Sequence, residues 1–386
     1  MTKTVVVLGA GMAGLPISHY LLSHTTTSVP DLRVILVNPS DEFYWNLASV
    51  RAVVPGQLSD DKYLWSIPKL FAKYPSDKFE FLAGKAETLS PDSNSVVVAL
   101  NDGSKRSIDY HTVIIATGSD SKDGMPWKTV GTSQQTRAAL AKLQQGIKDA
   151  KSIVVGGAGT TGVEFAGELG TVYAKAGTKA VTIISADTLP LESRVMESTR
   201  STAKSELERL NVKFIAGAKI TNVTEAGGQQ VLELTKKDGS KTTLKTDLFV
   251  PTFGMVLNTQ FAPRDMLDAQ GQLQQDKYLR APKYKNVFVL GDAGNLEAKQ
   301  AAMLENQIRH LAKQFDSYFK SGQVEEYKFD PSKVMLGISI GSGRGTGQVG
   351  TWKPFSLIMW FMKSRHLGTD KAMDIAAGLR TFGGKW

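Results

Sequence analysis

The sequence predicts an α/β protein made of two similar parallel-sheet units, each with an inserted β-meander, followed by a small C-terminal domain. Three observations lead to this prediction. A short apolar run followed at once by the pattern G-x-G-x-x-G occurs twice, at Gly9 and at Gly157. A turn of the form Asp-Gly-Ser-Lys also occurs twice, at 102–105 and at 238–241. Beyond residue 328 the chain becomes basic, aromatic and rich in glycine.

The first glycine pattern lies between a predicted strand and a predicted helix. Residues 4–8 are apolar and mostly β-branched, and a helix-compatible run covers 13–22. In such a strand–turn–helix, Gly9 makes the turn, Gly11 lets the backbone approach a pyrophosphate, and Gly14 lets the helix pack closely. The helix N-terminus adds free N–H groups for an anion. This predicts a dinucleotide site, with a plain strand–turn–helix as the alternative.

Four further positions of the first unit are candidates for ligand contact. The second strand ends at Asn38, where dinucleotide-binding folds usually carry an acid for the ribose hydroxyls. Asn38 can still bind hydroxyls, and Asp41 is a substitute. Arg51 ends an aromatic run and is predicted to reach the pyrophosphate, the alternative being a packed surface helix. The strand at 113–116 runs into Thr117-Gly118, small residues that let the backbone pass beneath a ligand.

The pattern then restarts after a connecting segment with a predicted helix near 132–147. An apolar strand at 152–155 precedes Gly157, Gly159 and Gly162. The spacing from Asp102 to Gly118 is 16 residues, and so is the spacing from Asp238 to Gly254. Two glycine loops in register with two meanders predict an internal duplication with two Rossmann-like dinucleotide-binding domains. We expect a discontinuous first domain (1–118 and 254–328), a second at 119–253, and a C-terminal domain at 329–386.

A carboxylate also follows the end of a third predicted strand. The apolar strand 286–290 is followed by Asp292, at the edge where open α/β sheets bind ligands. A helix is predicted over 296–319, with Asn295 as its N-cap and Lys299 in its first turn. A helix N-terminus and a cation would stabilise negative charge on a nearby ring system. The alternative for Lys299 is a solvated surface cation.

Composition narrows the classes of function. The formal net charge of +9 favours anionic partners, such as dinucleotide phosphates, an acidic membrane surface or nucleic acid. The absence of cysteine excludes a redox-active disulfide, a thiolate nucleophile and cysteine-ligated metal centres. No run reaches the ~20 apolar residues of a transmembrane helix, and no signal peptide precedes the first strand. We expect a cytoplasmic protein, at most peripheral to a membrane, with no metal site.

The C-terminal segment combines apolar aromatic residues with positive charge. From Lys328 onward, nine Lys or Arg residues stand against three Asp or Glu residues. This pattern suits a membrane interface or the entrance for a lipophilic substrate. A packed helix of the C-terminal domain, or a homodimer contact, is an equally good explanation. A nucleic-acid partner is not expected, because the charge does not alternate with aromatic residues as in a nucleic-acid groove.

Taken together, the glycine loops, Ala116-Thr117-Gly118 and Gly291-Asp292 resemble the two-dinucleotide-binding-domain flavoprotein superfamily, from residue 4 to about 320. The runs 46–51, 299–300 and 362–365 most resemble the apoptosis-inducing-factor-like branch, which includes ferroptosis-suppressor-type NAD(P)H–quinone oxidoreductases. The resemblance implies non-covalent FAD in the first unit and NADH or NADPH in the second. It also implies that Asp292 contacts the FAD ribitol, that Lys299 lies near the flavin, and that Glu164 lies near the nicotinamide.

Two departures from the family pattern matter. Asn38 stands where an acid is usual, and Ser185-Ala186-Asp187 stands where NADH-specific members carry an acid, so the choice between NADH and NADPH stays open. The myristoylation signal of the branch is absent as well.

The expected chemistry is hydride transfer from the nicotinamide to the flavin. Without cysteines, the reduced flavin must pass its electrons to a small acceptor such as a quinone, to dioxygen or to a redox protein. The sequence therefore predicts an FAD-dependent NAD(P)H–quinone oxidoreductase. One alternative is a reductase of an iron–sulfur protein or of a specialised metabolite. A more distant alternative is a basic nucleic-acid-binding protein with a structural flavin fold.

Overall fold

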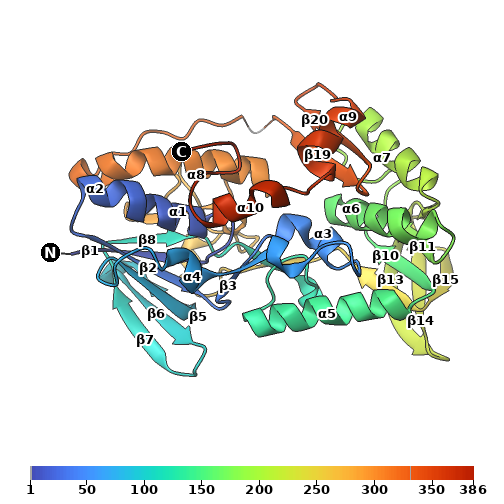
Figure 1. Ribbon diagram of the computed structural model, residues 1–386, viewed down its shortest axis with the longest axis horizontal. Coiled ribbons are helices and arrows are strands. Elements are labelled where there is room, and N and C mark those ends of the chain that lie inside the picture. The colour runs from blue at the N-terminus through green and yellow to red at the C-terminus, as the bar shows by residue number, and fades with distance from the viewer. Residues whose placement is uncertain (1, 331) are drawn as a thin grey trace.

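A computed structural model describes residues 2–330 and 332–386. Two α/β units lie side by side along the longest axis, and the C-terminal segment reaches over both of them (Figure 1). Within the described residues, no helix is both long enough and apolar enough to cross a membrane.

The first unit is built on a seven-stranded sheet with the order β18-β8-β1-β2-β5-β6-β7. Strand β1 pairs in parallel with β2 and β8, and β18 extends the parallel part beyond β8. The long strand β5 pairs first in parallel with β2 and then antiparallel with β6, so one strand joins the sheet to its meander. The bounds are β1 Lys3–Leu8, β2 Leu32–Asn38, β5 Phe79–Ser90, β6 Ser95–Leu100, β7 Lys105–Asp109, β8 Thr112–Ile115 and β18 Val287–Val289.

The second unit repeats this plan with one break. Its parallel sheet has the order β12-β11-β10-β16, and its meander β13-β14-β15 forms a separate antiparallel sheet. The break falls at Gly217, whose positive φ of 69° turns the chain between β12 and β13. The bounds are β10 Ser152–Gly156, β11 Ala180–Ile184, β12 Lys213–Ile215, β13 Ala218–Ala226, β14 Gln229–Lys236, β15 Lys241–Thr246 and β16 Leu248–Pro251. The predicted α/β class with two Rossmann-like units is confirmed, while the exact domain boundaries stay a prediction.

Helices cover the sheets. Thr132 caps α5 with the reciprocal hydrogen bonds of a capping box with Gln135, as expected for the predicted helix near 132–147. Helix α1 continues as a π-helical segment to Thr25. The bounds are α1 Gly14–Tyr20, α2 Thr26–Ser28, α3 Ser49–Ala52, α4 Ile67–Phe71, α5 Ser133–Asp149, α6 Thr160–Leu169, α7 Glu197–Arg209 and α8 Ala301–Ser321. A small hairpin, β3 Glu42–Tyr44 with β4 Leu64–Ser66, lies beside α4 in the first unit.

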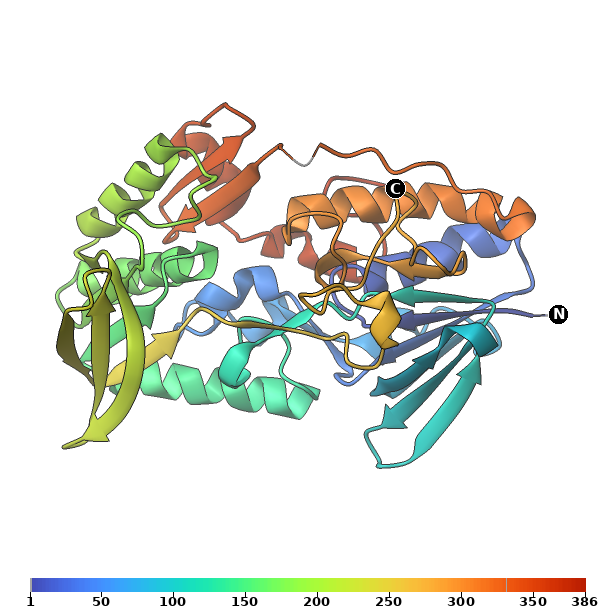
Figure 2. The same ribbon diagram turned by 180° about the vertical axis from the view of Figure 1, so that it is seen from behind.

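The chain crosses twice between the units, and the two crossings run together (Figure 2). Strand β9 (Ser119–Ser121) pairs antiparallel with β17 (Met255–Leu257). The hydroxyl of Thr117 donates to the carbonyl of Asn258 at 2.7 Å, which ties the end of β8 to the returning crossing. The two units are therefore joined by a short ribbon.

The C-terminal segment packs on both units. The hairpin β19 (Met335–Ile340) and β20 (Arg344–Val349) lies on α6 and α7, so closely that a Cβ on Gly167 would stand 2.6 Å from the backbone nitrogen of Gly341. Helix α9 (Ser356–Met359), a π-helical turn to Ser364, and α10 (Thr369–Ala376) then lead back to α1. There, the Nε2 of buried His19 lies 2.9 Å from the carbonyl oxygen of Ala376.

One element begins later than predicted. The helix expected over 296–319 is α8, which starts at Ala301. Asn295 is not its N-cap, because its Oδ1 accepts a hydrogen bond from the backbone N–H of Gln275 at 3.1 Å. Lys299 therefore lies in the loop before the helix, and its placement in a first helical turn was wrong.

Candidate functional site: two glycine loops and a buried charge network

The three glycines of the first loop have different surroundings. Gly9 has a φ of +99°, and a Cβ on it would lie 2.4 Å from the carbonyl oxygen of Ala116. A Cβ on Gly14 would lie 1.8 Å from the carbonyl oxygen of Gly9, so both positions are closed by backbone. Around Gly11, by contrast, no heavy atom lies within 4 Å of such a Cβ. Gly9 and Gly14 bring strand and helix together, and Gly11 faces an open cradle that fits the backbone approach of a pyrophosphate.

The second loop repeats this arrangement. Gly157 has a φ of +93°, and a Cβ on Gly162 would lie 1.9 Å from the carbonyl oxygen of Gly157. Gly159 again faces open space, and it stands at the N-cap of α6. Because the packed and open positions match those of the first loop, the molecule carries two equivalent cradles at the carboxyl ends of two parallel sheets.

Asn38 lies at the end of β2, beside the first glycine loop. Its Oδ1 accepts a hydrogen bond from the backbone N–H of Ala10 at 3.0 Å, and its Nδ2 donates to the carbonyl of Ser40 at 2.7 Å. Both ends of the amide are thus used within the chain, which holds the loop in place. Its proposed substitute, Asp41, accepts a hydrogen bond from the hydroxyl of Ser133. Ribose contact by Asn38 stays a prediction.

Asp292 follows β18 and lies near the crossing ribbon. Its Oδ2 accepts hydrogen bonds from the Nζ of Lys128 at 2.5 Å and from the hydroxyl of Ser119 at 3.0 Å. Burial opposes its ionisation, but the Lys128 ammonium and these hydrogen bonds hold the pKa of Asp292 below its ordinary value. Sequence reasoning did not find Lys128, because no motif marks a lone lysine in a connecting segment.

Lys299 lies in the same charge cluster. Its Nζ donates to the Oε1 of Gln272 at 2.5 Å and to the carbonyl of Gly294 at 3.3 Å. Burial lowers the pKa of this ammonium, while the nearby carboxylates of Asp292 and Asp268 act in the opposite direction. Lys299 is therefore a partly buried, hydrogen-bonded cation at the carboxyl end of the first sheet, which differs from a freely solvated lysine.

Arg51 forms a buried ion pair between the units. Its Nη2 and Nε donate to the two carboxylate oxygens of Glu168 on α6, at 2.7 and 3.0 Å. Its remaining donors reach the carbonyls of Ser364 and Arg365, at 2.7 and 3.1 Å. Burial raises the pKa of Glu168, opposed by the guanidinium beside it. These contacts favour a role for Arg51 in joining the two units to the C-terminal segment, and its contact with a pyrophosphate stays a prediction.

Glu164 lies one helical turn before Glu168 and makes a second buried pair. Its Oε1 accepts from the Nζ of Lys363 at 2.6 Å and from the backbone N–H of Ser339 at 2.9 Å. Two neighbouring carboxylates of α6 are thus neutralised by two cations from other parts of the chain. The sequence did not predict that Arg51 pairs with Glu168 or that Lys363 pairs with Glu164, because residues so distant in the chain share no local pattern.

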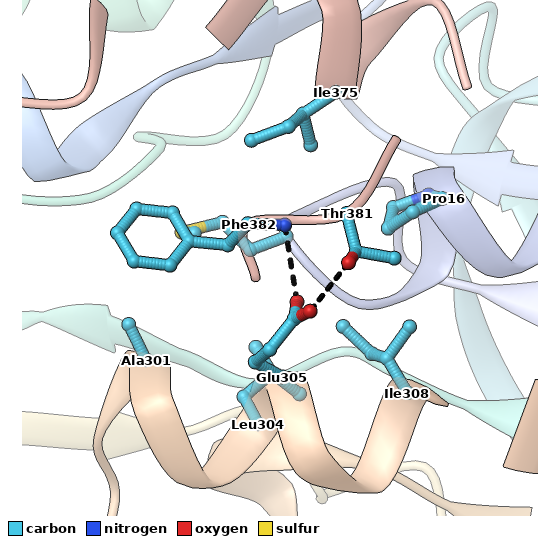
Figure 3. A pocket seen from close by; sticks show the side chains of 9 residues that line it. Pro16, Ala301, Leu304, Glu305, Ile308, Ile375, Thr381 and Phe382 are labelled. Carbon is cyan, nitrogen blue, oxygen red and sulfur yellow. Dashed lines mark hydrogen bonds between the residues drawn. The ribbon is translucent and has the colours of Figure 1, made fainter. Parts of the chain in front are cut away.

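The end of the chain is held by a third carboxylate, Glu305 of α8. It accepts hydrogen bonds from the hydroxyl of Thr381, from the backbone N–H of Phe382 at 3.1 Å and from that of Gly383 at 2.9 Å. Figure 3 shows the hydroxyl of Thr381 and the backbone nitrogen of Phe382 facing this carboxylate, while the ring of Phe382 points away from it. These residues line an apolar cavity of about 10 Å³ to which Met12 of the glycine loop also contributes. Such a cavity has room for about one water molecule.

Two matching glycine cradles, each at the carboxyl end of its own parallel sheet, define a protein that binds two dinucleotides. The chain belongs to the pyridine nucleotide-disulphide oxidoreductase family, whose sequence model matches residues 3–306. It is an NAD(P)H-dependent oxidoreductase that uses FAD, and the superfamily resemblance inferred from its motifs is confirmed.

Known relatives cover nearly the whole chain. It is 36% identical to the oxidoreductase ptaL of Pestalotiopsis fici, over 91% of this chain and 92% of that protein. It is 26% identical to ferroptosis suppressor protein 1 of Taeniopygia guttata, over 95% of this chain and 94% of that protein. Among solved structures, the sulfide:quinone oxidoreductase of Aquifex aeolicus shares the fold, with a TM-score of 0.76 at 16% identity over 98% of this chain and 92% of that one.

Proposed function

We propose that this protein oxidises NAD(P)H through FAD and passes the electrons to a small lipophilic quinone. The observation that carries the choice of acceptor is an exposed apolar face on the C-terminal segment. The same segment is joined to both units through Arg51 and Lys363. A thiol relay is excluded because the chain has no cysteine.

The proposal assigns the two cradles to the two cofactors. The first loop, with Gly9, Gly11 and Gly14, would hold FAD together with Thr117, Gly118 and Asp292. The second loop, with Gly157, Gly159 and Gly162, would hold NADH or NADPH. The open space at Gly11 and Gly159 supports a dinucleotide in each loop, because it leaves room for a ligand against the backbone. When bound, FAD supplies the redox chemistry, accepting a hydride and releasing its electrons to the acceptor.

Within this proposal, side chains of the protein stabilise charge on the flavin and hold the binding loops in place. Lys299, partly buried beside Asp292, would stabilise negative charge that develops on the flavin ring. Glu164 would lie near the nicotinamide, with its charge held by Lys363. Asn38 would act by holding the first glycine loop through the N–H of Ala10.

The apolar face lies on α9 and the π-helical turn that follows it. Phe355 and Phe361 are 77% and 69% exposed, and Leu357 and Met362 are exposed to a similar extent. The opposite side of this segment is buried, through Met359, Ser364 and Leu367. Large apolar side chains gathered on one surface, within a basic segment, mark a contact with a membrane, a lipophilic ligand or another protein. These outward residues are not core, so the packed-helix explanation does not apply to them.

A quinone is one of the acceptors used by proteins of this fold. One solved protein of the same fold is, by its name, a sulfide:quinone oxidoreductase. We place the quinone entrance at the apolar face, because a lipophilic acceptor dissolved in a membrane must be reached from its surface.

The experiment compares acceptors in a double variant, Leu357→Ser with Phe361→Ser. Turnover of NADH and NADPH is measured with a long-tailed quinone and with ferricyanide, a small hydrophilic acceptor. Quinone turnover and binding to anionic liposomes should fall at least several-fold, while ferricyanide turnover should not change. Val223→Ser, on the exposed meander strand β13, serves as a matched control. Unchanged quinone turnover in the folded double variant would refute the entrance, and a change from dimer to monomer would identify the face as a subunit contact.

A further inference from the structure

A basic groove lies at the end of the first unit that is opposite to the glycine loops. It has a volume of about 550 Å³ and opens between the loop before β18, the C-terminal half of α8 and the segment that follows α8. The position of the groove relative to the sheet follows from Tyr318 of α8. Its hydroxyl lies 2.9 Å from that of Thr112, the first residue of β8. The groove is thus at the amino ends of the parallel strands, whereas the glycine loops are at their carboxyl ends. Figure 2 shows the segment after α8 running back along that helix.

The central residue of the groove is Arg280, a nearly buried arginine that forms a long ion pair with Asp276 and whose side chain makes no hydrogen bond within the described residues. Its side chain is only 11% exposed, and the nearest carboxylate oxygen, from Asp276, is 3.7 Å from its Nε. The Nε is buried, and among the residues that the structure describes it finds no acceptor. Arg51, 8% exposed, makes four hydrogen bonds instead. The terminal nitrogens of Arg280 are not among the buried atoms and make no hydrogen bond within the described residues, so they are the donors that a ligand in the groove can use.

The loop that carries Arg280 is preorganised. The Oδ1 of Asp276 accepts hydrogen bonds from the backbone N–H groups of Tyr278 and Arg280, at 2.8 and 2.9 Å. Between them, buried Leu279 adopts a φ of +60°, a left-handed conformation that residues other than glycine disfavour. The guanidinium lies against the ring of Tyr278, with its carbon 4.7 Å from the ring centre. Arg280 is therefore held in one orientation before any ligand arrives.

The other side chains of the groove are mostly donors. Lys285 and Lys313 bring two exposed ammonium groups, and Ser317 brings a hydroxyl. The Oε1 of buried Gln314 accepts from the backbone N–H of Glu325 at 3.0 Å, which leaves its NH2 group as a further donor. The carboxylate of Glu325 is the one acid among the lining residues. Three cations face Glu325 and the Asp276 carboxylate that pairs with Arg280, so the groove keeps a net positive charge that favours an anionic ligand.

We propose that this groove binds a compact phosphorylated anion, with a phosphoryl group facing Arg280. A guanidinium matches two oxygens of a phosphoryl group at once, and the two lysines add point charges on the same ligand. The volume lies within the range of small-molecule sites, about 300 to 1,000 Å³. The carboxylate of Glu325 suits a hydroxyl or amine elsewhere on the ligand. The site is separate from the two dinucleotide loops, so the proposal does not depend on the redox function.

The test measures binding of inorganic pyrophosphate to the FAD-loaded protein by calorimetry. One saturable site is expected, and Arg280→Met should weaken it at least tenfold, with a smaller loss for Lys313→Gln. Lys320→Gln is the matched control, since Lys320 is an exposed lysine of the same helix that does not line the groove. Gly159→Val should leave the affinity unchanged, because the second glycine loop is not the site. Citrate, a polycarboxylate of similar charge, should bind more weakly than pyrophosphate.

Absence of saturable binding would overturn the proposal, and so would an equal loss in Lys320→Gln, which would mean diffuse attraction to the helix. Loss of binding in Gly159→Val would place pyrophosphate on the glycine loop instead. The melting temperature of the ligand-free Arg280→Met protein should change little, because the ion pair with the partly exposed Asp276 is long, at 3.7 Å, and the Nε has no hydrogen-bond acceptor within the described residues. A marked fall would show that Arg280 is structural and would equally refute the site.

Discussion

At the scale of single residues, buried charges decide how the parts of this molecule hold together. Arg51 uses its guanidinium on Glu168 and on two carbonyls of the C-terminal segment. Taking such a pair out of water is expensive, and the geometry repays it only while both partners are present. Exposed pairs, such as Arg137 with Glu42, carry little of this cost.

This contrast leads to a prediction for stability. Arg51→Met should lower the free energy of unfolding by about 3–5 kcal/mol, because the carboxylate of Glu168 is left buried and unpaired. Adding Glu168→Met should restore much of the loss. The control Arg137→Met should cost no more than about 1 kcal/mol. Denaturant titration of the four proteins measures these differences, and equal small losses in all of them would contradict the buried-pair account.

His19 leads to a prediction about how the stability of the fold depends on pH. Burial, with the nearby Lys73 charge, lowers its pKa to about 3, against the hydrogen bond to Ala376. The unfolded chain, with an ordinary value near 6.5, binds a proton between these limits that the folded protein does not bind. Stability should therefore fall as the pH drops from 6.5 toward 3, by up to about 1.4 kcal/mol per pH unit from this residue. In His19→Gln the dependence should be flatter over this window, as followed by thermal unfolding.

At the scale of elements, each glycine loop has one glycine with a positive φ, one glycine in open space and one glycine against the backbone of the preceding turn. Gly159 has a φ of −71°, which any residue can adopt, and free space around it. Gly162 instead meets the backbone oxygen of Gly157. The same substitution should consequently block a ligand at one position and disrupt the fold at the other.

Gly159→Val should therefore leave a folded protein that still retains FAD but is no longer reduced by NADH or NADPH. Gly162→Val should fail to fold, or should melt far below the parent, because its side chain overlaps the strand–helix contact. Absorbance of released FAD gives the cofactor content, and stopped-flow absorbance follows flavin reduction. If Gly159→Val lost FAD but kept reaction with NAD(P)H, the two units would have to exchange roles.

At the scale of the whole molecule, the C-terminal segment joins the two units. Its hairpin lies on α6, its Lys363 pairs with Glu164, and its last residues are held by Glu305 of the first unit (Figure 1). Arg51, His19 and Glu305 of the first unit also hold this segment, so a change at the Lys363 contact should loosen the hairpin side of the segment rather than detach all of it.

Lys363→Met should loosen this segment without removing FAD, since Glu164 would be left buried with only neutral partners. Limited proteolysis should then cut between 322 and 334 at least several-fold faster than in the parent. Lys353→Met, which removes an ammonium bound to the Ser198 carbonyl at the protein surface, is the control. Similar cleavage rates in both variants would show that the Glu164 pair does not hold the segment.

The sequence by itself determined the two strand–glycine–helix units, their duplication and the carboxylate at the end of the third strand, because these features depend on neighbours within a few residues. The start of α8 at Ala301 depended on tertiary contacts, since Asn295 and Lys299 bind Gln275 and Gln272 and are thereby kept out of the helix. The pairs Arg51–Glu168, Glu164–Lys363 and Lys128–Asp292 could not be predicted. Charged residues are common on any surface, and only the packing of distant segments decides which of them are buried together.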